Sequence, residues 1–107
     1  MAKVVWTDPA LQELNDLAEY IALDNPAAAS QLVQEVFAKA ERLEEFPQSG
    51  HVPEELTHSA YRELHSVYRE LIVPPCRIFY REDKGKVFVL HVMRDARQLK
   101  TYLLYTR

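Results

Sequence analysis

The sequence predicts an α+β fold, in which a small antiparallel β-sheet is covered by an N-terminal helical hairpin. Two segments with apolar residues at helical spacing come first, and three segments with strand-like alternation follow them. The connections are short, so successive elements are expected to pack against each other. The expected order is strand, helix, helix, three strands and a short C-terminal helix. With 107 residues, we expect a single domain over 1–107.

A short β-type run opens the chain at residues 3–6, and a helix is expected to follow it. Asp8 is a good N-cap, and Pro9 suits the first helical position. These signals predict a helix over roughly 9–24. Its apolar stripe consists of Leu11, Leu14, Leu17, Ala18, Ile21 and Ala22.

A second helix is predicted directly after the first. Pro26 disfavours helical geometry at Asn25, so the chain turns there, and Asn25 can cap the next helix. This helix is expected to end near Phe46 and Pro47. Because the connection is so short, the two helices should form an antiparallel hairpin. The second apolar stripe consists of Leu32, Val33, Val36, Phe37, Ala40 and Leu43.

The second half of the chain is expected to be a loop followed by β-structure. Two prolines and a glycine mark residues 47–66 as loop. The tetrapeptide Tyr-Arg-Glu-Leu occurs at 61–64 and again at 68–71. We expect the second copy to be a strand and the first to be loop or a short turn.

Three strands are predicted, over 67–73, 76–82 and 87–93. Pro74 and Pro75 end the first, and residues 83–85 predict a tight hairpin turn between the other two. Both faces of the third strand are apolar, so it is expected to lie centrally in the sheet. Asp95 is expected to cap a final short helix. That helix would carry Leu99, Tyr102 and Leu103.

The composition favours a protein of the reducing cytoplasm. Cys76 is the one cysteine, which excludes an intramolecular disulfide. No apolar run is long enough to span a bilayer, and the segment before the first helix is too short for a signal peptide. The chain has only two glycines, so a glycine-rich phosphate loop is excluded.

Charge is unevenly divided between the two halves of the chain. Residues 1–60 hold 3 Lys/Arg and 11 Asp/Glu, whereas residues 61–107 hold 10 Lys/Arg and 5 Asp/Glu. The formal net charge is −3. Two interpretations stay open, namely an anionic partner for the basic half, or acidic helices that simply face water.

Histidine and cysteine show no metal-binding pattern. The spacings of His51, His58, His65 and His91 fit no usual ligand set, and we expect neither a metal nor a cofactor. His91 lies between apolar strand residues and is expected to be packed and hydrogen-bonded. Cys76 is expected to be a small buried strand residue rather than a nucleophile.

Several segments carry a family resemblance when they are taken in order along nearly the whole chain. They are Asp16–Ala22 with Asp24–Ala29, Phe46–Glu54, Arg69–Leu71, Cys76–Arg81 and Val87–Val92. Together they resemble the ParE-like plasmid-stabilisation toxins of the RelE/ParE superfamily. The chain departs from that pattern at Cys76, where an aromatic residue is frequent, and at Arg94, where a histidine is frequent. Residues 58–66 look like an insertion.

The resemblance implies that the chain is the toxin of a type II toxin–antitoxin pair. ParE-like members poison DNA gyrase. RelE-like members cut mRNA in the ribosomal A site without metal, using lysines, arginines and often a C-terminal tyrosine. Both kinds are neutralised by a cognate antitoxin, which is expected here to be a ribbon-helix-helix or similar DNA-binding protein.

The strand at 68–73 favours a gyrase inhibitor, which is not an enzyme. RelE-like members carry their catalytic lysines on the matching strand, and this strand has none. Net acidity also argues against strong binding to ribosomal RNA. Two alternatives remain, an mRNA interferase and a superfamily member that has lost toxicity and acts only as a binding module. If the chain is RelE-like, the resemblance gives three catalytic candidates, Arg77, Arg81 and Tyr102.

Two interaction surfaces are expected. The basic half supplies the candidates for target binding, which are Arg69, Arg77, Arg81, Arg94, Arg97 and Lys100. Arg77 and Arg81 have a structural alternative, which is pairing with Glu70, Glu82 or helix carboxylates. The helices supply the candidates for antitoxin binding, which are Leu11, Leu14, Ile21, Val33 and Phe37. Such partners add a helix in a groove or a strand at an edge.

Overall fold

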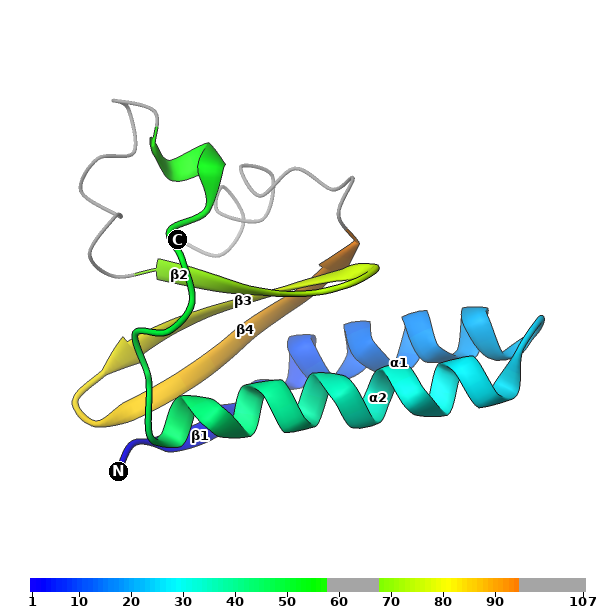
Figure 1. The fold of residues 1–107 in the computed structure, drawn as a ribbon, viewed down its shortest axis with the longest axis horizontal. Helices are drawn as coiled ribbons and strands as arrows, with labels where there is room; N and C mark the ends of the chain where they lie inside the picture. Colours follow the sequence, from blue (N-terminus) through cyan, green and yellow to red (C-terminus); the bar gives the residue numbers. More distant parts are fainter. Residues whose placement is uncertain (58–67, 95–107) are drawn as a thin grey trace.

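The computed structural model describes residues 1–57 and 68–94, which form two helices and a four-stranded sheet (Figure 1). The helices precede three of the four strands, as expected. The elements are β1 (Lys3–Trp6), α1 (Asp8–Ala22), α2 (Pro26–Glu41), the 3₁₀ turns η1 (Arg42–Glu44) and η2 (Glu54–Thr57), β2 (Tyr68–Val73), β3 (Cys76–Asp83) and β4 (Lys86–Arg94).

The strands lie in the order β1-β4-β3-β2, so β4 is central as expected. The meander β2-β3-β4 is antiparallel, but β1 joins β4 in parallel, from Lys3 opposite Lys86 to Trp6 opposite Val89. The expected antiparallel meander is confirmed, and the expectation of an antiparallel sheet is corrected to a mixed sheet by the parallel β1. The direction of β1 depends on where the helical hairpin returns the chain, which local sequence patterns do not encode.

The β3–β4 hairpin contains a tight turn and a β-bulge. Lys84 (φ 51°) and Gly85 (φ 79°) form a two-residue turn with positive φ at both positions, which matches the twist of the flanking strands and confirms the predicted turn. Further along, Tyr80 lies opposite Val89 while Phe79 lies opposite His91, which leaves Leu90 as an extra residue in β4. This β-bulge bends the central strand.

The start of α1 differs from the prediction, because Thr7 rather than Asp8 is the N-cap. The Thr7 hydroxyl accepts the backbone N–H of Ala10 at 3.4 Å and donates to the Val89 carbonyl at 2.7 Å. Asp8 therefore falls in the first turn. The additional bond to β4 holds Thr7 in place, and local sequence does not encode that contact. The cap of α2 is confirmed, since the Asn25 side chain accepts the N–H of Ala28 at 3.1 Å.

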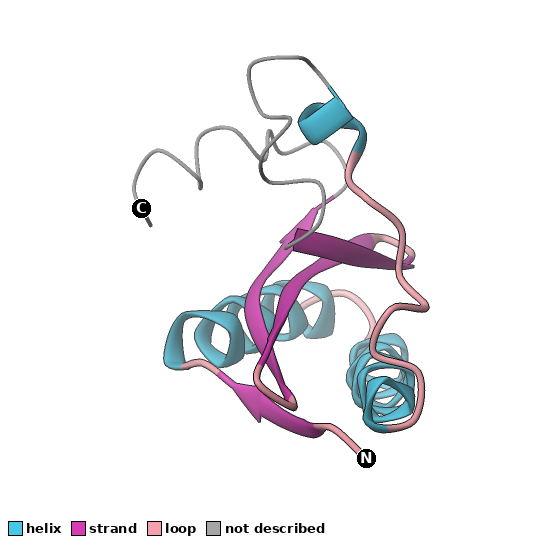
Figure 2. Ribbon diagram, turned by 90° about the vertical axis from the view of Figure 1, so that its left-hand side faces the viewer, coloured by secondary structure: helices cyan, strands magenta, loops and turns pink. Residues whose placement is uncertain are grey.

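The main core lies between the helical hairpin and one face of the sheet. In Figure 2 the two helices lie toward the bottom of the view and η2 lies at the top, with strands of the sheet between these levels. Buried residues on the helix side include Leu14, Val36, Ile78 and Val89. A smaller cluster on the opposite side consists of Leu56, Phe79 and Met93. The sheet is thus buried on both faces over part of its area, which accounts for the apolar character of both faces of β4.

The described residues contain no helix that is long and apolar enough to cross a membrane. Cys76 is fully buried, as expected. The second Tyr-Arg-Glu-Leu copy forms most of β2, also as expected. The first copy, the final helix, Arg97, Lys100 and Tyr102 lie outside the described residues.

Candidate functional site

The sheet face opposite the helices, called here the outer face, gathers the polar side chains of the meander. Phe79 packs on this face against Leu56, whereas its neighbours Ile78 and Tyr80 belong to the clusters on the helix side. Strand alternation therefore places Arg77 and Arg81 on the outer face with Phe79. In register, Tyr68 lies opposite Arg81, and Glu70 lies opposite Phe79.

Arg77 is bound to a buried carboxylate. Its Nε donates to Glu70 Oε2 at 2.8 Å, and its Nη2 lies 2.6 Å from the same oxygen. The other carboxylate oxygen lies 2.9 Å from Nε2 of His51. Glu70 is 4% exposed and Arg77 is 8% exposed, whereas the His51 side chain is 61% exposed. The predicted structural pairing of Arg77 with Glu70 is therefore confirmed.

A row of flat side chains crosses the outer face. The rings of Tyr68 and Phe79 stack with centroids 5.2 Å apart, and Phe79 lies 6.4 Å from the ring of His91 in a similar orientation. Nδ1 of His91 lies 3.1 Å from a Glu13 carboxylate oxygen, which also accepts the N–H of Val92 at 3.1 Å. The carboxylate of α1 thus fixes the imidazole beside the bulge. This confirms the prediction that His91 is packed and hydrogen-bonded.

One end of this row opens into a concavity of about 380 Å³. The described residues that line it are Thr7, Pro9, Tyr68, Arg81, Leu90 and His91. Arg81 contributes a positive charge to the described lining of the concavity, and its contacts with neighbouring side chains are long. Its Nη2 lies 4.0 Å from Asp83, and its guanidinium lies 5.9 Å from the Phe88 ring centroid. Both members of the Arg81–Asp83 pair are well exposed, so water screens the attraction between them.

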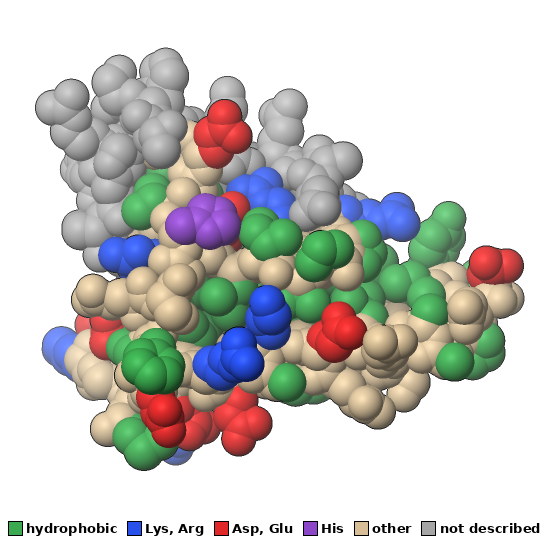
Figure 3. Space-filling view, viewed as in Figure 1, with side chains coloured by type: hydrophobic (Ala, Val, Ile, Leu, Met, Phe, Trp, Pro, Cys, Tyr) green, Lys and Arg blue, Asp and Glu red, His purple; other side chains and the backbone are tan. Residues whose placement is uncertain are grey.

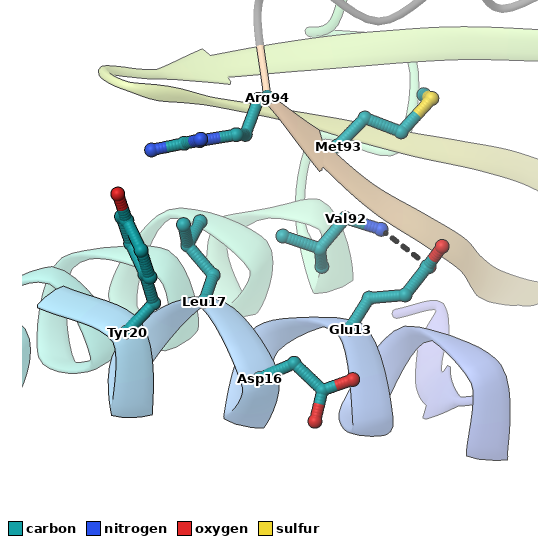
Figure 4. Close-up of a pocket in the computed structure, with 7 residues that line it drawn as sticks. All are labelled: Glu13, Asp16, Leu17, Tyr20, Val92, Met93 and Arg94. Carbon is teal, nitrogen blue, oxygen red and sulfur yellow. Dashed lines mark hydrogen bonds between the residues drawn. The ribbon is translucent and has the colours of Figure 1, made fainter.

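A second concavity, of about 300 Å³, lies between α1 and the end of β4 (Figure 4). Arg94 extends over the ring of Tyr20, with 5.2 Å from the guanidinium carbon to the ring centroid. Leu17 forms part of the floor, and Glu13 reaches toward β4 from the same helix. The concavity therefore combines an exposed cation–aromatic pair with two carboxylates, those of Glu13 and Asp16.

The loop at 47–53 is fastened to the sheet by Tyr80. The Tyr80 hydroxyl donates to the Pro47 carbonyl at 2.9 Å and accepts the N–H of Gly50 at 3.0 Å. Nη1 of Arg69 donates to the Gly50 carbonyl at 2.9 Å. Burial raises the pKa of the Tyr80 phenol above its usual value of 10.0, while the Gly50 hydrogen bond and the charge of Arg69 oppose the rise. Arg69 therefore helps to hold the loop against the sheet.

The predicted target-binding arginines that lie within the described residues do not form one patch. Arg69 and Arg77 are engaged by the loop and by Glu70, whereas Arg81 and Arg94 extend toward solvent. Arg81 lies opposite Phe88, and Arg94 lies opposite Cys76. On β4, Phe88 and Arg94 are six residues apart, which corresponds to about 20 Å along a strand. Arg94 contacts α1, so it does not share the surroundings of Arg81.

The predicted antitoxin-binding residues divide into exposed and buried members. Leu11 is 41% exposed and Phe37 is 39% exposed, and the Phe37 ring rests against Trp6 at 4.7 Å. Leu14 is only 3% exposed and belongs to the core. Ile21 and Val33 are half-buried against the same core. Figure 3 shows hydrophobic side chains gathered between α2 and the strands above it.

Sequence reasoning missed the side chains that organise the outer face. Glu13 lies off the apolar stripe of its helix, yet it reaches His91 and the backbone N–H of Val92. Glu70 was considered only as a partner for Arg77, and its contact with His51 was not foreseen. Within residues 1–57 and 68–94, no group of three or more His, Cys, Asp or Glu side chains is arranged to hold a metal ion.

Comparison with known proteins identifies the family. A model described as the ParE toxin of the type II toxin–antitoxin system parDE matches residues 4–99. Toxin RelE2 of Caulobacter vibrioides is 33% identical over 97 residues, which make up 91% of this chain and 99% of that protein. A solved structure described as the chromosomal ParDE TA system from P. aeruginosa has a TM-score of 0.68 at 21% identity, covers 88% of this chain and 96% of its own, and shares the fold. The chain therefore belongs to the ParE toxin family of type II toxin–antitoxin systems, within the RelE/ParE superfamily.

Proposed function

We propose that this toxin inhibits DNA gyrase by binding to it and is neutralised by a cognate antitoxin. The observation that carries the proposal is the buried Glu70–Arg77 pair. The family resemblance matches Arg77 to a phosphate-binding arginine of RNA-cutting members, but here a carboxylate 2.8 Å away neutralises it. Releasing a buried arginine from its carboxylate costs about 3–5 kcal/mol, which a phosphate would have to offset.

The composition of β2 supports the same proposal. RNA cleavage without metal needs groups that accept and donate protons, and cations that stabilise the phosphate. Where the RNA-cutting members carry lysines, β2 has Tyr68, the neutralised Glu70 and no lysine. A protein that acts by binding needs none of these groups. Both targets are cytoplasmic, so the proposal requires the toxin to act in the cytoplasm.

An RNA-cutting activity remains the second candidate, because two observations favour it. The relative that is 33% identical carries the name Toxin RelE2. The outer face also presents Arg81 beside Tyr68 and a carboxylate-held His91. A cation, a phenol and an imidazole are groups that such chemistry uses.

One pair of assays separates the candidates. Purified toxin is incubated with gyrase, plasmid and ATP, and in parallel with ribosomes programmed with a defined mRNA. We expect loss of supercoiling with trapped cleavage complexes, and intact mRNA. Unimpaired supercoiling with cleaved mRNA would overturn the proposal in favour of the second candidate. Normal activity in both assays, together with normal growth on induction, would leave only a binding module.

Among the described residues, we propose that Arg94 contributes most to target binding. It is exposed, and its guanidinium forms a cation–aromatic pair with Tyr20. Arg94→Gln removes its charge and is expected to raise the toxin concentration needed to inhibit gyrase. Lys39→Gln is the matched control, since Lys39 is an exposed cation on α2. Equal inhibition by the Arg94 variant and the wild type would exclude Arg94 from the target surface.

For the antitoxin we propose a surface centred on Leu11 and Phe37, the exposed members of the predicted set. A partner helix that covers two such side chains would bury apolar area worth roughly 25 cal/mol per Å². The partner itself is expected to be encoded by a short reading frame next to the toxin's own. Leu11→Gln with Phe37→Gln should weaken its binding in a pull-down. Gln12→Ala, an exposed neighbour on α1, is the control.

A further inference from the structure

The concavity between α1 and the end of β4 lies where β4 continues past its parallel neighbour. β1 ends at Trp6, opposite Val89, so the last residues of β4 extend beyond the described strand on that side. On this edge the N–H of Val92 is accepted by the Glu13 carboxylate of α1 at 3.1 Å. The hollow that remains has a volume of about 300 Å³, at the lower end of the usual range for small-ligand sites.

Opposite charges face this concavity from its two sides. Arg94 extends from the end of β4, whereas the carboxylates of Glu13 and Asp16 come from α1 (Figure 4). Leu17 and the ring of Tyr20 add apolar surface to the same lining. Within residues 1–57 and 68–94, Arg94 forms no ion pair with a carboxylate. The lining therefore presents a positive and a negative side that do not neutralise each other by direct contact.

Arg94 is well placed to bind an incoming carboxylate. Its side chain is exposed, and its guanidinium carbon lies 5.2 Å from the centroid of the Tyr20 ring. That contact holds the group in position while leaving its positive charge in place. A guanidinium carries five N–H donors, of which two can bind the two oxygens of one carboxylate side by side.

The two carboxylates on α1 can accept further hydrogen bonds. Oδ1 of Asp16 accepts Nε2 of Gln12 at 2.8 Å, and Oε1 of Glu13 accepts the N–H of Val92 and lies 3.1 Å from Nδ1 of His91. An ionised carboxylate has about four acceptor sites, so these contacts do not saturate either group. Residues three apart on a helix are neighbours on its surface. An ammonium group, with its three donors, matches such a pair.

We propose that this concavity binds a free α-amino acid with an apolar side chain. The carboxylate of the ligand pairs with Arg94, its ammonium group pairs with Asp16 and Glu13, and its side chain packs on Leu17. A zwitterion satisfies both signs of charge at once, whereas a simple anion would meet the carboxylates and a simple cation would meet the arginine. This binding goes beyond gyrase inhibition and does not depend on it, because it is measured on the toxin alone.

The test is a titration of the full-length protein with L-leucine, followed by backbone amide chemical shifts. We expect saturable shifts at Leu17, Val92 and Arg94 in the millimolar range. Leucinamide lacks the carboxylate and N-acetyl-leucine lacks the ammonium group, so each should bind about tenfold more weakly. Leucyl-leucine carries the same two charges one residue further apart, and it should also bind more weakly than leucine.

Two substitutions assign the charges of the ligand to their partners. Arg94→Gln should weaken the binding of leucine and N-acetyl-leucine about tenfold and leave that of leucinamide unchanged, because leucinamide has no carboxylate to pair. Asp16→Asn should weaken the binding of leucine and leucinamide about threefold and leave that of N-acetyl-leucine unchanged. A merely structural role of either residue would weaken the binding of all three ligands alike.

Lys39→Gln and Asp24→Asn are the matched controls, since each removes the same charge from an exposed position outside the described lining. Both should bind leucine as tightly as the wild type does, and the unfolding midpoint of each variant checks that the fold is retained. Absence of saturable shifts, analogues that bind as tightly as leucine, or an equal loss in the control variants would overturn the proposal. Tighter binding of leucyl-leucine than of leucine would overturn it as well, by assigning the concavity to a peptide.

Discussion

The Tyr80 hydroxyl accepts the backbone N–H of Gly50 at 3.0 Å and thereby fastens the 47–53 loop to a buried strand. The close approach leaves no room for a side chain at residue 50. A Cβ there would lie 2.5 Å from the Tyr80 hydroxyl and 2.6 Å from the Glu70 carbonyl oxygen. The glycine is therefore required by packing, because the loop crosses directly over the tyrosine.

Gly50→Ala is expected to destabilise the protein, since either the loop or Tyr80 must shift. Overpacking of this kind costs about 1–3 kcal/mol, measured as the free energy of unfolding in urea. Ser49→Ala, at the exposed neighbouring position, serves as the control and should change stability by less than about 0.5 kcal/mol. Equal stabilities of the two variants would contradict the close approach.

Tyr80→Phe tests the hydrogen bonds without changing the packing of the ring. The substitution leaves the N–H of Gly50 and the carbonyl of Pro47 without their partner in the fold. We expect a loss of about 1–3 kcal/mol in the free energy of unfolding. Amide hydrogen exchange at Gly50 should accelerate as well. Unchanged exchange there would show that the loop is held by other contacts.

Ionisation of the Tyr80 phenol should contribute to the pH dependence of stability. Its pKa is raised in the fold, so the folded state favours the neutral phenol over the phenolate. The resulting stabilisation is fully present below pH 10, where the phenol is neutral in both states, and is lost as the pH rises through the folded pKa. Urea midpoints at alkaline pH should therefore fall more steeply for the wild type than for Tyr80→Phe. Parallel falls would assign the effect to other groups.

The contribution of the buried Glu70 carboxylate to stability can be tested by removing its contacts one at a time. Glu70→Gln leaves the Arg77 charge without its counter-ion and is expected to cost about 3–5 kcal/mol of stability. His51→Ala should cost less than about 1 kcal/mol, because that side chain is largely exposed. Replacing the pair together, as Glu70→Leu with Arg77→Met, should recover most of the loss. A double variant as unstable as Glu70→Gln would show that the pair itself is stabilising.

Thr7 and Asp8 can be compared directly as caps of α1. Thr7→Val removes the bond to Ala10 and the bond to the Val89 carbonyl, and should cost about 1–2 kcal/mol in unfolding experiments. Asp8→Ala removes only a favourable charge near the helix N-terminus and should cost less than about 1 kcal/mol. A larger loss of stability in Asp8→Ala than in Thr7→Val would identify Asp8 as the N-cap instead.

The predictions from sequence succeeded where the cause is local. Asn25 with Pro26 set the start of α2, and the Lys84–Gly85 turn set the β3–β4 hairpin, because in each case neighbouring residues determine the backbone angles. Apolar spacing likewise located both helices. Each of these signals spans fewer residues than the element it defines.

The failures share a different cause, which is contact between distant segments. The Thr7 hydroxyl also bonds a carbonyl 82 residues away, and Glu13 contacts His91 at a separation of 78 residues. The same holds for the candidate site. The burial of Arg77 and the separation of Arg94 from Arg81 follow from packing that periodicity does not describe.

The parallel pairing of β1 with β4 has a consequence for synthesis on the ribosome. The second strand of that pair is complete only when residue 94 has been made, so a nascent chain holding β1 and both helices still lacks the strand that covers them. Core residues of α1 such as Ala10 and Leu14 lack their β4 neighbours Val89 and Val92 throughout that interval. Translation therefore includes an interval in which the helices have been made but the central strand of the sheet that covers them has not.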